Sequence, residues 1–139
     1  GTENLPGIVG FAAALSMVHT DKEKENKRLR TLQEYIMQNI PAYISINGSM
    51  DSDKRISNNI NICIPGMDSE FALFKFDVAG IELSTGTTCQ NKQEDSRSYV
   101  VDALGKGCGA SSLRISMGRY TRMKDMRRFI AVLKRVLAK

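Results

Sequence analysis

The hydrophobic period of this chain changes at Pro41, and the change limits the folds that the sequence can adopt. Before Pro41, apolar residues such as Leu29, Leu32 and Ile36 recur at helical spacing. After Pro41, short segments alternate apolar and polar residues, as strands do, and further helical patterns separate these segments. The chain has 139 residues, which is the size of one ordinary domain. The pattern therefore predicts a single α+β domain in which helices cover a small sheet.

Local signals give the expected elements. Helices are expected over residues 5–18, 21–40, 68–80 and 98–104 and from about residue 121 onward, and strands over residues 43–48, 56–64, 81–84 and 113–118. The second helix is expected to start behind the capping-box pattern Thr20-Asp21-Lys22-Glu23, and the third is indicated by Phe71, Leu73, Phe74 and Val78. The first helix is apolar nearly all round, so it should present an exposed patch that needs a partner.

Composition excludes several classes of protein. No apolar run approaches the roughly 20 residues that cross a bilayer, and the first residues lack the order of a secretory signal. The formal net charge of +5 is only a mild basic excess. Three cysteines and one histidine cannot build a disulfide framework, which favours a reducing compartment. We therefore expect a cytoplasmic protein without a membrane segment.

The three cysteines lie in different sequence environments. Cys63 lies among isoleucines in an expected strand, where a buried, inert thiol is the usual case. Cys108 lies in a glycine-rich turn and is expected to be structural. Cys89 lies in a polar loop without Val, Leu, Ile or Met, where a thiolate could reach a substrate. No C-x-x-C pair is present and His19 is the only histidine, so no metal site is expected.

Several segments, in chain order, resemble one family. Residues 84–89, STGTTC, resemble the S-S-G-S-A-C segment of the NifS-like cysteine desulfurases, which are fold-type-I enzymes of the class V aminotransferase superfamily and use pyridoxal phosphate. Residues 98–105, SYVVDALG, resemble the family's S-Y/H-V-L-x-A-L/M-G, and residues 112–121, SLRISMGRYT, resemble its S-I-R-x-S-L-G-R-x-T. Residues 1–11, GTENLPGIVGF, are similar to G-T-x-N-x-x-G-I-x-G-F, and residues 57–63 are a looser match to P-N-x-x-N-x-S.

The resemblance implies that residues 1–139 are the family's C-terminal small domain, with a mostly antiparallel sheet. The lysine that holds pyridoxal phosphate would lie upstream of this chain, because no His-Lys pair occurs in it. The chain would then be an expressed fragment or a proteolytic product, inactive alone. The apolar helix within residues 1–19 would pack on the large domain.

The resemblance also implies roles for three residues. Cys89 would take sulfur from L-cysteine as a persulfide, leaving L-alanine, and pass it to a sulfur acceptor or scaffold protein, for example in iron–sulfur cluster assembly. Arg114 would hold the substrate carboxylate, since a planar guanidinium can grip two oxygens. Thr2 would reach the cofactor phosphate of the neighbouring subunit of a homodimer. The resemblance gives no reason to expect a membrane, nucleic acid or a metal.

Two alternatives remain open at this point. The first is a selenocysteine lyase or another class V enzyme. The second is a nucleic-acid-binding module, which the basic C-terminal helix supports. Aromatic residues are only 6% of the chain and tryptophan is absent, which weakens the second alternative because such modules stack bases on aromatic rings.

Overall fold

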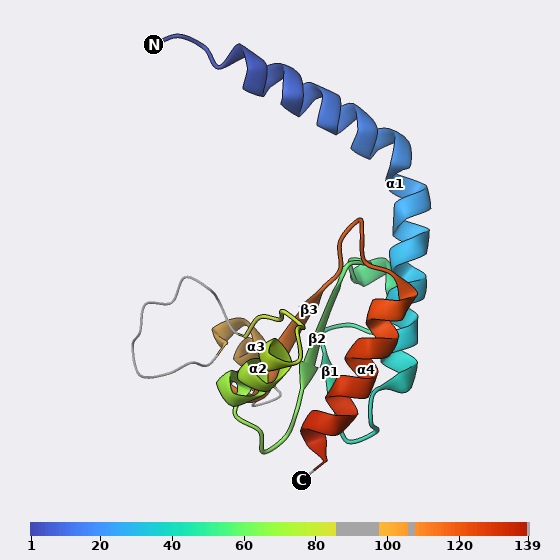
Figure 1. The fold of residues 1–139 in the computed structure, drawn as a ribbon, viewed down its shortest axis with the longest axis vertical. Coiled ribbons are helices and arrows are strands. Elements are labelled where there is room, and N and C mark those ends of the chain that lie inside the picture. Colours follow the sequence, from blue (N-terminus) through green and yellow to red (C-terminus); the bar gives the residue numbers. More distant parts are fainter. Residues whose placement is uncertain (86–97, 106–107, 139) are drawn as a thin grey trace.

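The computed structural model describes residues 1–85, 98–105 and 108–138 (Figure 1). The elements in these ranges are α1 (Leu5–Asn39), β1 (Ser45–Asn47), β2 (Asn59–Cys63), α2 (Ser69–Val78), α3 (Tyr99–Ala103), β3 (Ser112–Ser116) and α4 (Met123–Leu137), with short 3₁₀ turns at Ser52–Lys54 and Gly109–Ser111. The prediction of an α+β fold is confirmed. None of the helices in the described ranges is both long enough and apolar enough to cross a membrane.

The sheet has three antiparallel strands in the order β1-β2-β3. Its two faces differ because side chains alternate along a strand. Ile46 of β1, Ile62 of β2 and Leu113 of β3 share a register row on the apolar face. The opposite face carries polar residues from all three strands. Only one face of the sheet therefore contributes to the main hydrophobic core.

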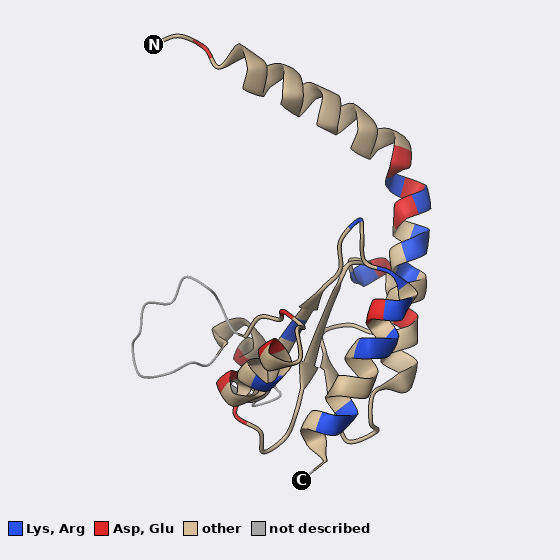
Figure 2. Cartoon of the chain, viewed as in Figure 1, with Lys and Arg blue, Asp and Glu red and all other residues tan. Residues whose placement is uncertain are grey.

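The C-terminal half of α1 and the whole of α4 cover the apolar face (Figure 1). Helix α4 buries Met126, Phe129, Ile130, Leu133 and Val136, as its spacing predicted. Its basic residues lie on the opposite, exposed side of the helix (Figure 2). The carboxylate of Asp125 accepts a hydrogen bond from the Arg122 N–H at 2.8 Å and so stabilises the start of α4.

The two helices expected before Pro41 are one continuous helix of 35 residues. The capping pattern at Thr20 does not begin a new helix, because no glycine or proline interrupts the chain there. The Thr20 hydroxyl instead donates to the Ser16 carbonyl within the helix, at 3.0 Å. Residues 5–18, which we call the arm, extend away from the sheet with exposed apolar side chains (Figure 1). The expected exposed patch is therefore present.

Helix α2 has the predicted ends, and most of the apolar residues that indicated it are exposed. The Asp68 side chain accepts a hydrogen bond from the Phe71 N–H at 2.8 Å, and Gly80 follows the helix with a φ of +68°. The buried residues are Ala72 and Phe76, whereas Phe71, Phe74 and Val78 are exposed. The Phe76 ring stacks on Phe129 of α4, with centroids 5.6 Å apart.

Two further expectations are corrected. Residues 81–84 do not form a strand, and only Ser84 forms a bridge to β3. Cys63 is buried as expected, but it is not a free thiol, because it forms a disulfide with Cys108. The two residues lie far apart in sequence and their Cα atoms are 6.0 Å apart. With Val101 they form a small cluster on the polar face of the sheet. Three cysteines exclude a framework of bridges but allow one bridge.

We predict that Phe76→Ala lowers the free energy of unfolding by about 3–5 kcal/mol, because it empties a fully buried site. The matched control is Phe74→Ala on the same helix, where the side chain is 64% exposed and the expected change is below about 1 kcal/mol. Urea unfolding of both variants measures the difference. Equal losses would contradict the orientation of α2.

Candidate functional site

Arg114 lies in the middle of β3, on the polar face of the sheet. Its backbone N–H donates to the Ser84 carbonyl at 2.7 Å, and its carbonyl accepts from the Ser84 N–H at 3.2 Å. The residue is half-buried. Among the described residues, its guanidinium has no hydrogen bond or ion pair. A half-buried guanidinium without a protein partner is suited to bind an anion from outside the chain.

The described residues just before and just after the segment that contains Cys89 are hydrogen-bonded to β3 or to the turn that precedes it. Ser84, five positions before Cys89 in the sequence, pairs with Arg114. Ser98 caps α3, and its N–H donates to the Gly109 carbonyl at 3.1 Å, just before β3 begins. Cys89 itself lies outside the described residues. The predicted site residue Arg114 and the segment that leads to Cys89 are therefore joined through one strand.

A row of polar side chains crosses the sheet at Arg114. Asn47 of β1 pairs with Asn61 of β2, and Asn61 pairs with Arg114 of β3. The Asn47 Nδ2 donates to the Asn61 Oδ1 at 2.7 Å. Asn47 is only 3% exposed, yet its Oδ1 has no hydrogen-bond partner. Asparagines within expected strands are a visible signal in the sequence, but the strand register that aligns them with Arg114 is a long-range property.

Thr2 lies at the far end of the arm and is exposed (Figure 1). The structure does not bring it near Arg114 within this chain. Among the described residues, its hydroxyl makes no hydrogen bond. Its role on a neighbouring subunit, which the family resemblance implied, stays a prediction.

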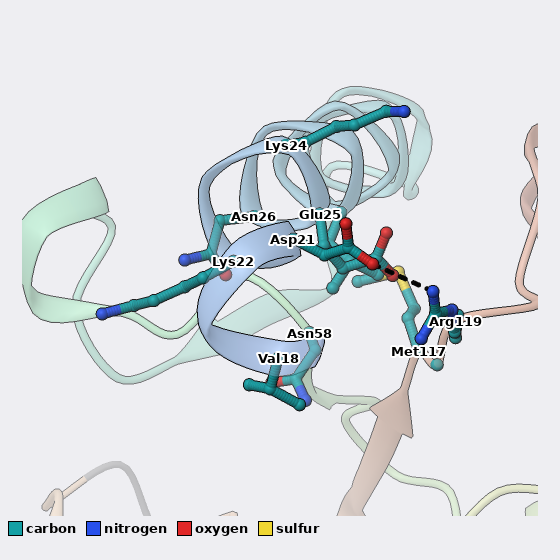
Figure 3. A pocket seen from close by; sticks show the side chains of 11 residues that line it. Val18, Asp21, Lys22, Lys24, Glu25, Asn26, Asn58, Met117 and Arg119 are labelled. Carbon is teal, nitrogen blue, oxygen red and sulfur yellow. Dashed lines mark hydrogen bonds and ion pairs between the residues drawn. The ribbon is translucent and has the colours of Figure 1, made fainter. Parts of the chain in front are cut away.

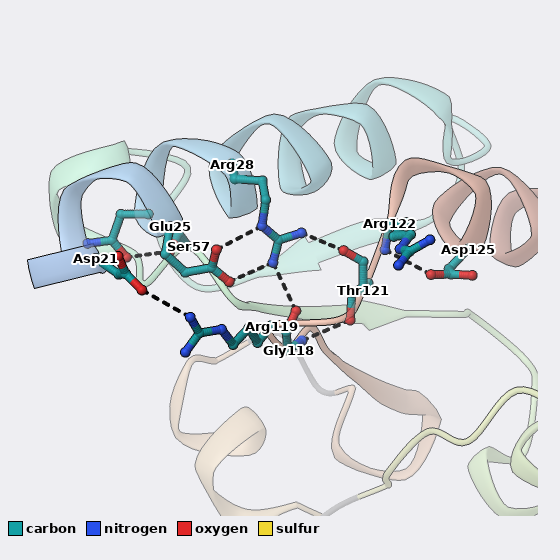
Figure 4. A network of polar contacts seen from close by, with 10 residues as sticks. Asp21, Glu25, Arg28, Ser57, Gly118, Arg119, Thr121, Arg122 and Asp125 are labelled. Carbon is teal, nitrogen blue, oxygen red and sulfur yellow. Dashed lines mark hydrogen bonds and ion pairs between the residues drawn. The ribbon is translucent and has the colours of Figure 1, made fainter. Parts of the chain in front are cut away.

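A network of polar contacts around Arg28 joins α1 to the turn that follows β3 (Figure 4). The Arg28 guanidinium binds both carboxylate oxygens of Glu25, at 2.6 and 2.8 Å. It also donates to the Gly118 carbonyl at 3.0 Å and to the Thr121 carbonyl at 2.5 Å. The hydrogen bond from Arg28 lowers the pKa of Glu25; burial opposes this shift, and the positive charges of Arg28 and Arg119 add to it. The same contact raises the pKa of Arg28.

A pocket of about 430 Å³ lies beside this Arg28 network (Figure 3). Its walls come from α1 and from the turn after β3, and Leu29 and Met117 form part of its apolar lining. Asp21 and Glu25 point toward Arg119, and Asp21 forms an ion pair with it at 3.0 Å. Its acidic side chains are thus engaged by arginines of this chain. Its two lysines, Lys22 and Lys24, are exposed to solvent, whereas Arg114 is half-buried.

The comparison with protein families decides the assignment. The model of the family "Aminotransferase class-V" matches residues 1–129. This chain belongs to the aminotransferase class-V family. Thr2, Cys89 and Arg114 lie within the matched residues.

Relatives and solved structures within the family agree. The chain is 31% identical to cysteine desulfurase IscS of Dictyoglomus turgidum over all of its length and 30% identical to IscS 1 of Archaeoglobus fulgidus over 99% of it. It spans only 36% of each relative. Among structures, the NifS-like protein from Rickettsia africae superimposes on 98% of the chain, with a TM-score of 0.82 and 25% identity, and the chain covers 35% of it. The resemblance to NifS-like cysteine desulfurases is confirmed.

We predict that Glu25→Gln lowers the free energy of unfolding at neutral pH and has little effect in acid. A carboxyl whose pKa is lowered in the folded state stabilises the fold above its ordinary pKa, here 4.5, and loses this contribution as the pH falls through the folded value. Both side chains are about one-third exposed, so solvent screening limits the loss at pH 7 to roughly 0.5–1 kcal/mol.

The matched control for this prediction is Glu34→Gln, at an exposed position of α1 that has no ion pair among the described residues. Urea unfolding of parent and variants between neutral pH and about pH 3 gives the comparison. A Glu25→Gln loss that stays constant over this range would contradict the role of the Arg28 contact.

Proposed function

We propose that residues 1–139 form the C-terminal, small domain of a pyridoxal-phosphate-dependent cysteine desulfurase. The whole enzyme would remove sulfur from L-cysteine as a persulfide on Cys89 and release L-alanine. The observation that carries the proposal is the Ser84–Arg114 bridge, because it joins an unpartnered arginine to the segment that leads to Cys89. The family match and the cysteine desulfurase relatives support it.

Cys89 would act as the nucleophile. Its thiolate attacks the sulfur of the substrate, a sulfur–sulfur bond forms, and the carbon–sulfur bond of the substrate breaks. The electron pair of that bond stays on the substrate carbon, which then takes a proton and becomes the methyl group of alanine. Cys89 keeps the sulfur as a persulfide, a reversible modification from which a second thiol can remove it. The balance needs no external oxidant or reductant.

Covalent geometry limits the distance over which this chemistry must be arranged. Five peptide units separate Ser84 from Cys89, and extended chain spans at most about 3.3–3.6 Å per residue. The Cys89 Cα therefore lies within roughly 18 Å of the Ser84 Cα. This limit allows the thiol to reach a substrate whose carboxylate is held at Arg114.

This chain would contribute two groups to the bound substrate and cofactor. Arg114 would hold the substrate carboxylate with two parallel hydrogen bonds. Thr2, with its exposed hydroxyl, would donate to the cofactor phosphate in the neighbouring subunit of a homodimer. Pyridoxal phosphate, when bound, supplies the electron sink that makes the bonds at the substrate carbon labile. The lysine that holds it would lie outside these 139 residues.

The arm would pack on the large domain of the enzyme. It exposes Leu5, Ile8, Val9, Phe11 and Leu15, each at least half accessible to solvent. A helix that is apolar on this scale is stable in water only when a partner surface covers it. The chain spans about a third of its relatives, so a large domain of the kind they carry is the proposed partner.

We place the enzyme in the cytoplasm, with a sulfur acceptor or scaffold protein of iron–sulfur cluster assembly as its partner. The side chains of Cys63 and Cys108 stay almost fully buried, so neither competes with Cys89 for the substrate.

We predict that Cys89→Ser in the full-length protein lowers alanine formation from L-cysteine by at least about 100-fold, because the hydroxyl is a far weaker nucleophile than the thiolate. Mass spectrometry after a single turnover should find the added sulfur atom on Cys89. The control is the double variant Cys63→Ser/Cys108→Ser, which should keep both the turnover and the modification. Undiminished turnover in Cys89→Ser would contradict the persulfide mechanism. If only selenocysteine is consumed, the protein is a lyase of the alternative class.

We predict that Phe11→Ser destabilises the full-length enzyme but not residues 1–139 alone. Phe11 is 70% exposed in this chain, so its removal leaves the small domain almost unchanged, within about 0.5 kcal/mol. If the large domain covers it, the loss there should reach about 2 kcal/mol or more. Urea unfolding of both forms gives the two values. An equal effect in both would contradict the proposed contact.

A further inference from the structure

The pairing of Arg114 and Asn61 brings their side chains unusually close. Ser84 uses both backbone hydrogen-bonding groups of Arg114, on the side of β3 that faces away from β2. Opposite Asn61, Arg114 is therefore in a non-hydrogen-bonded pair, the type in which facing Cα atoms lie about 4.5 Å apart and side chains are nearest. Both side chains leave the sheet on the polar face.

The Asn47 contact fixes which end of the Asn61 amide faces Arg114. Asn47 donates its Nδ2 to the Asn61 Oδ1 at 2.7 Å, so the oxygen of Asn61 faces β1. The oxygen and the nitrogen of a planar amide diverge from the same carbon, so with its oxygen on Asn47 the Asn61 NH₂ group is turned away from Asn47, and the neighbour on its other side is Arg114 of β3. Within the described residues, that NH₂ group has no acceptor, and neither has the guanidinium of Arg114.

Two adjacent donors cannot bond to each other and need a common acceptor. A carboxylate accepts up to four hydrogen bonds and can take two from a guanidinium and one from an amide. Asn47 gives the second, independent observation. Only 3% of its surface is exposed, and its Oδ1 has no hydrogen-bond partner, which is unfavourable for a buried polar atom. The hydrogen bond from Asn47 to Asn61 is present although the Asn47 Oδ1 stays unsatisfied, and this hydrogen bond holds the Asn61 amide in one orientation.

We propose that Asn61 is a substrate-binding residue that donates its Nδ2–H to the substrate carboxylate beside Arg114, with Asn47 as the residue that positions it. The inference rests on the proposed function, because it names how the same site selects its substrate. The site then prefers thiols that carry a carboxylate over thiols that carry only an amine. Arg114 supplies the positive charge that attracts the carboxylate, and the Asn61 Nδ2–H fixes the orientation in which the carboxylate binds.

The test uses the full-length holoenzyme and three variants. Asn61→Ala removes the donor and should raise the KM for L-cysteine about tenfold, with kcat changed less than about threefold. Asn61→Asp keeps the oxygen that Asn47 binds but replaces the donor by a negative oxygen, so it should fold like the parent and raise the KM by about 100-fold or more. Asn59→Ala is the matched control: it lies on the same strand and face but pairs with Ser116, and its KM should stay within about twofold of the parent.

Two inhibitors separate carboxylate binding from a general loss of the site. In calorimetric titrations, 3-mercaptopropionate has the carboxylate and thiol without the amine, whereas cysteamine has the amine and thiol without the carboxylate. We expect Asn61→Ala and Asn61→Asp to weaken binding of 3-mercaptopropionate about tenfold or more and to leave cysteamine within about twofold. Equal loss of both inhibitors, or loss of neither, would overturn the proposal.

These outcomes distinguish the inference from the proposed function. If the parent converts L-cysteine to alanine and Asn61→Asp has the parent's KM, the result supports the proposed cysteine desulfurase function and contradicts the substrate-binding role of Asn61. If the parent does not convert L-cysteine, the proposed function falls. The titrations with 3-mercaptopropionate and cysteamine still decide whether Asn61 binds a carboxylate, because they do not depend on turnover.

Discussion

The pair of backbone hydrogen bonds between Ser84 and Arg114 is the contact on which the rest of the site depends. It extends the sheet by one residue beyond β3, at the point where the chain continues toward Cys89. It also uses both backbone groups of Arg114 on one side, which leaves the other side to a close side-chain pair with Asn61. Without this bridge, the segment that precedes Cys89 would lose its two hydrogen bonds to Arg114.

Local structure was largely predictable from the sequence, because it depends on residues close together in the chain. Gly80 and Gly105 end helices with positive φ, and Asp68 and Ser98 cap them, as expected. The amphipathic pattern of α4 gave its buried face. The prediction of two helices before Pro41 was wrong, because a capping motif marks a helix start only when the preceding residues leave the helix. Here α1 continues through Thr20.

Features that depend on long-range pairing could not be predicted in this way. Phe74 and Phe76 are equally apolar, and only the position of α4 decides that Phe76 is buried. The bridge between Cys63 and Cys108 depends on where the Gly109–Ser111 turn meets the end of β2. For the candidate site, the family motifs gave Cys89, Arg114 and Thr2. The motif over residues 57–63 contains Asn61 but gave it no role, because its relation to Arg114 follows from the strand register.

A polar face on an antiparallel sheet needs no special explanation when water covers it. Asn47 is different, because it lies on that face and is almost fully buried with an unsatisfied oxygen. An apolar residue of similar size there would avoid the loss, and a domain of this size has little stability to spare. Natural sequences tend to break such local rules where a site needs a fixed side chain. The row from Asn47 to Arg114 therefore fits a binding surface better than it fits a solvated face, and it places the proposed carboxylate site beside the strand edge that leads toward Cys89.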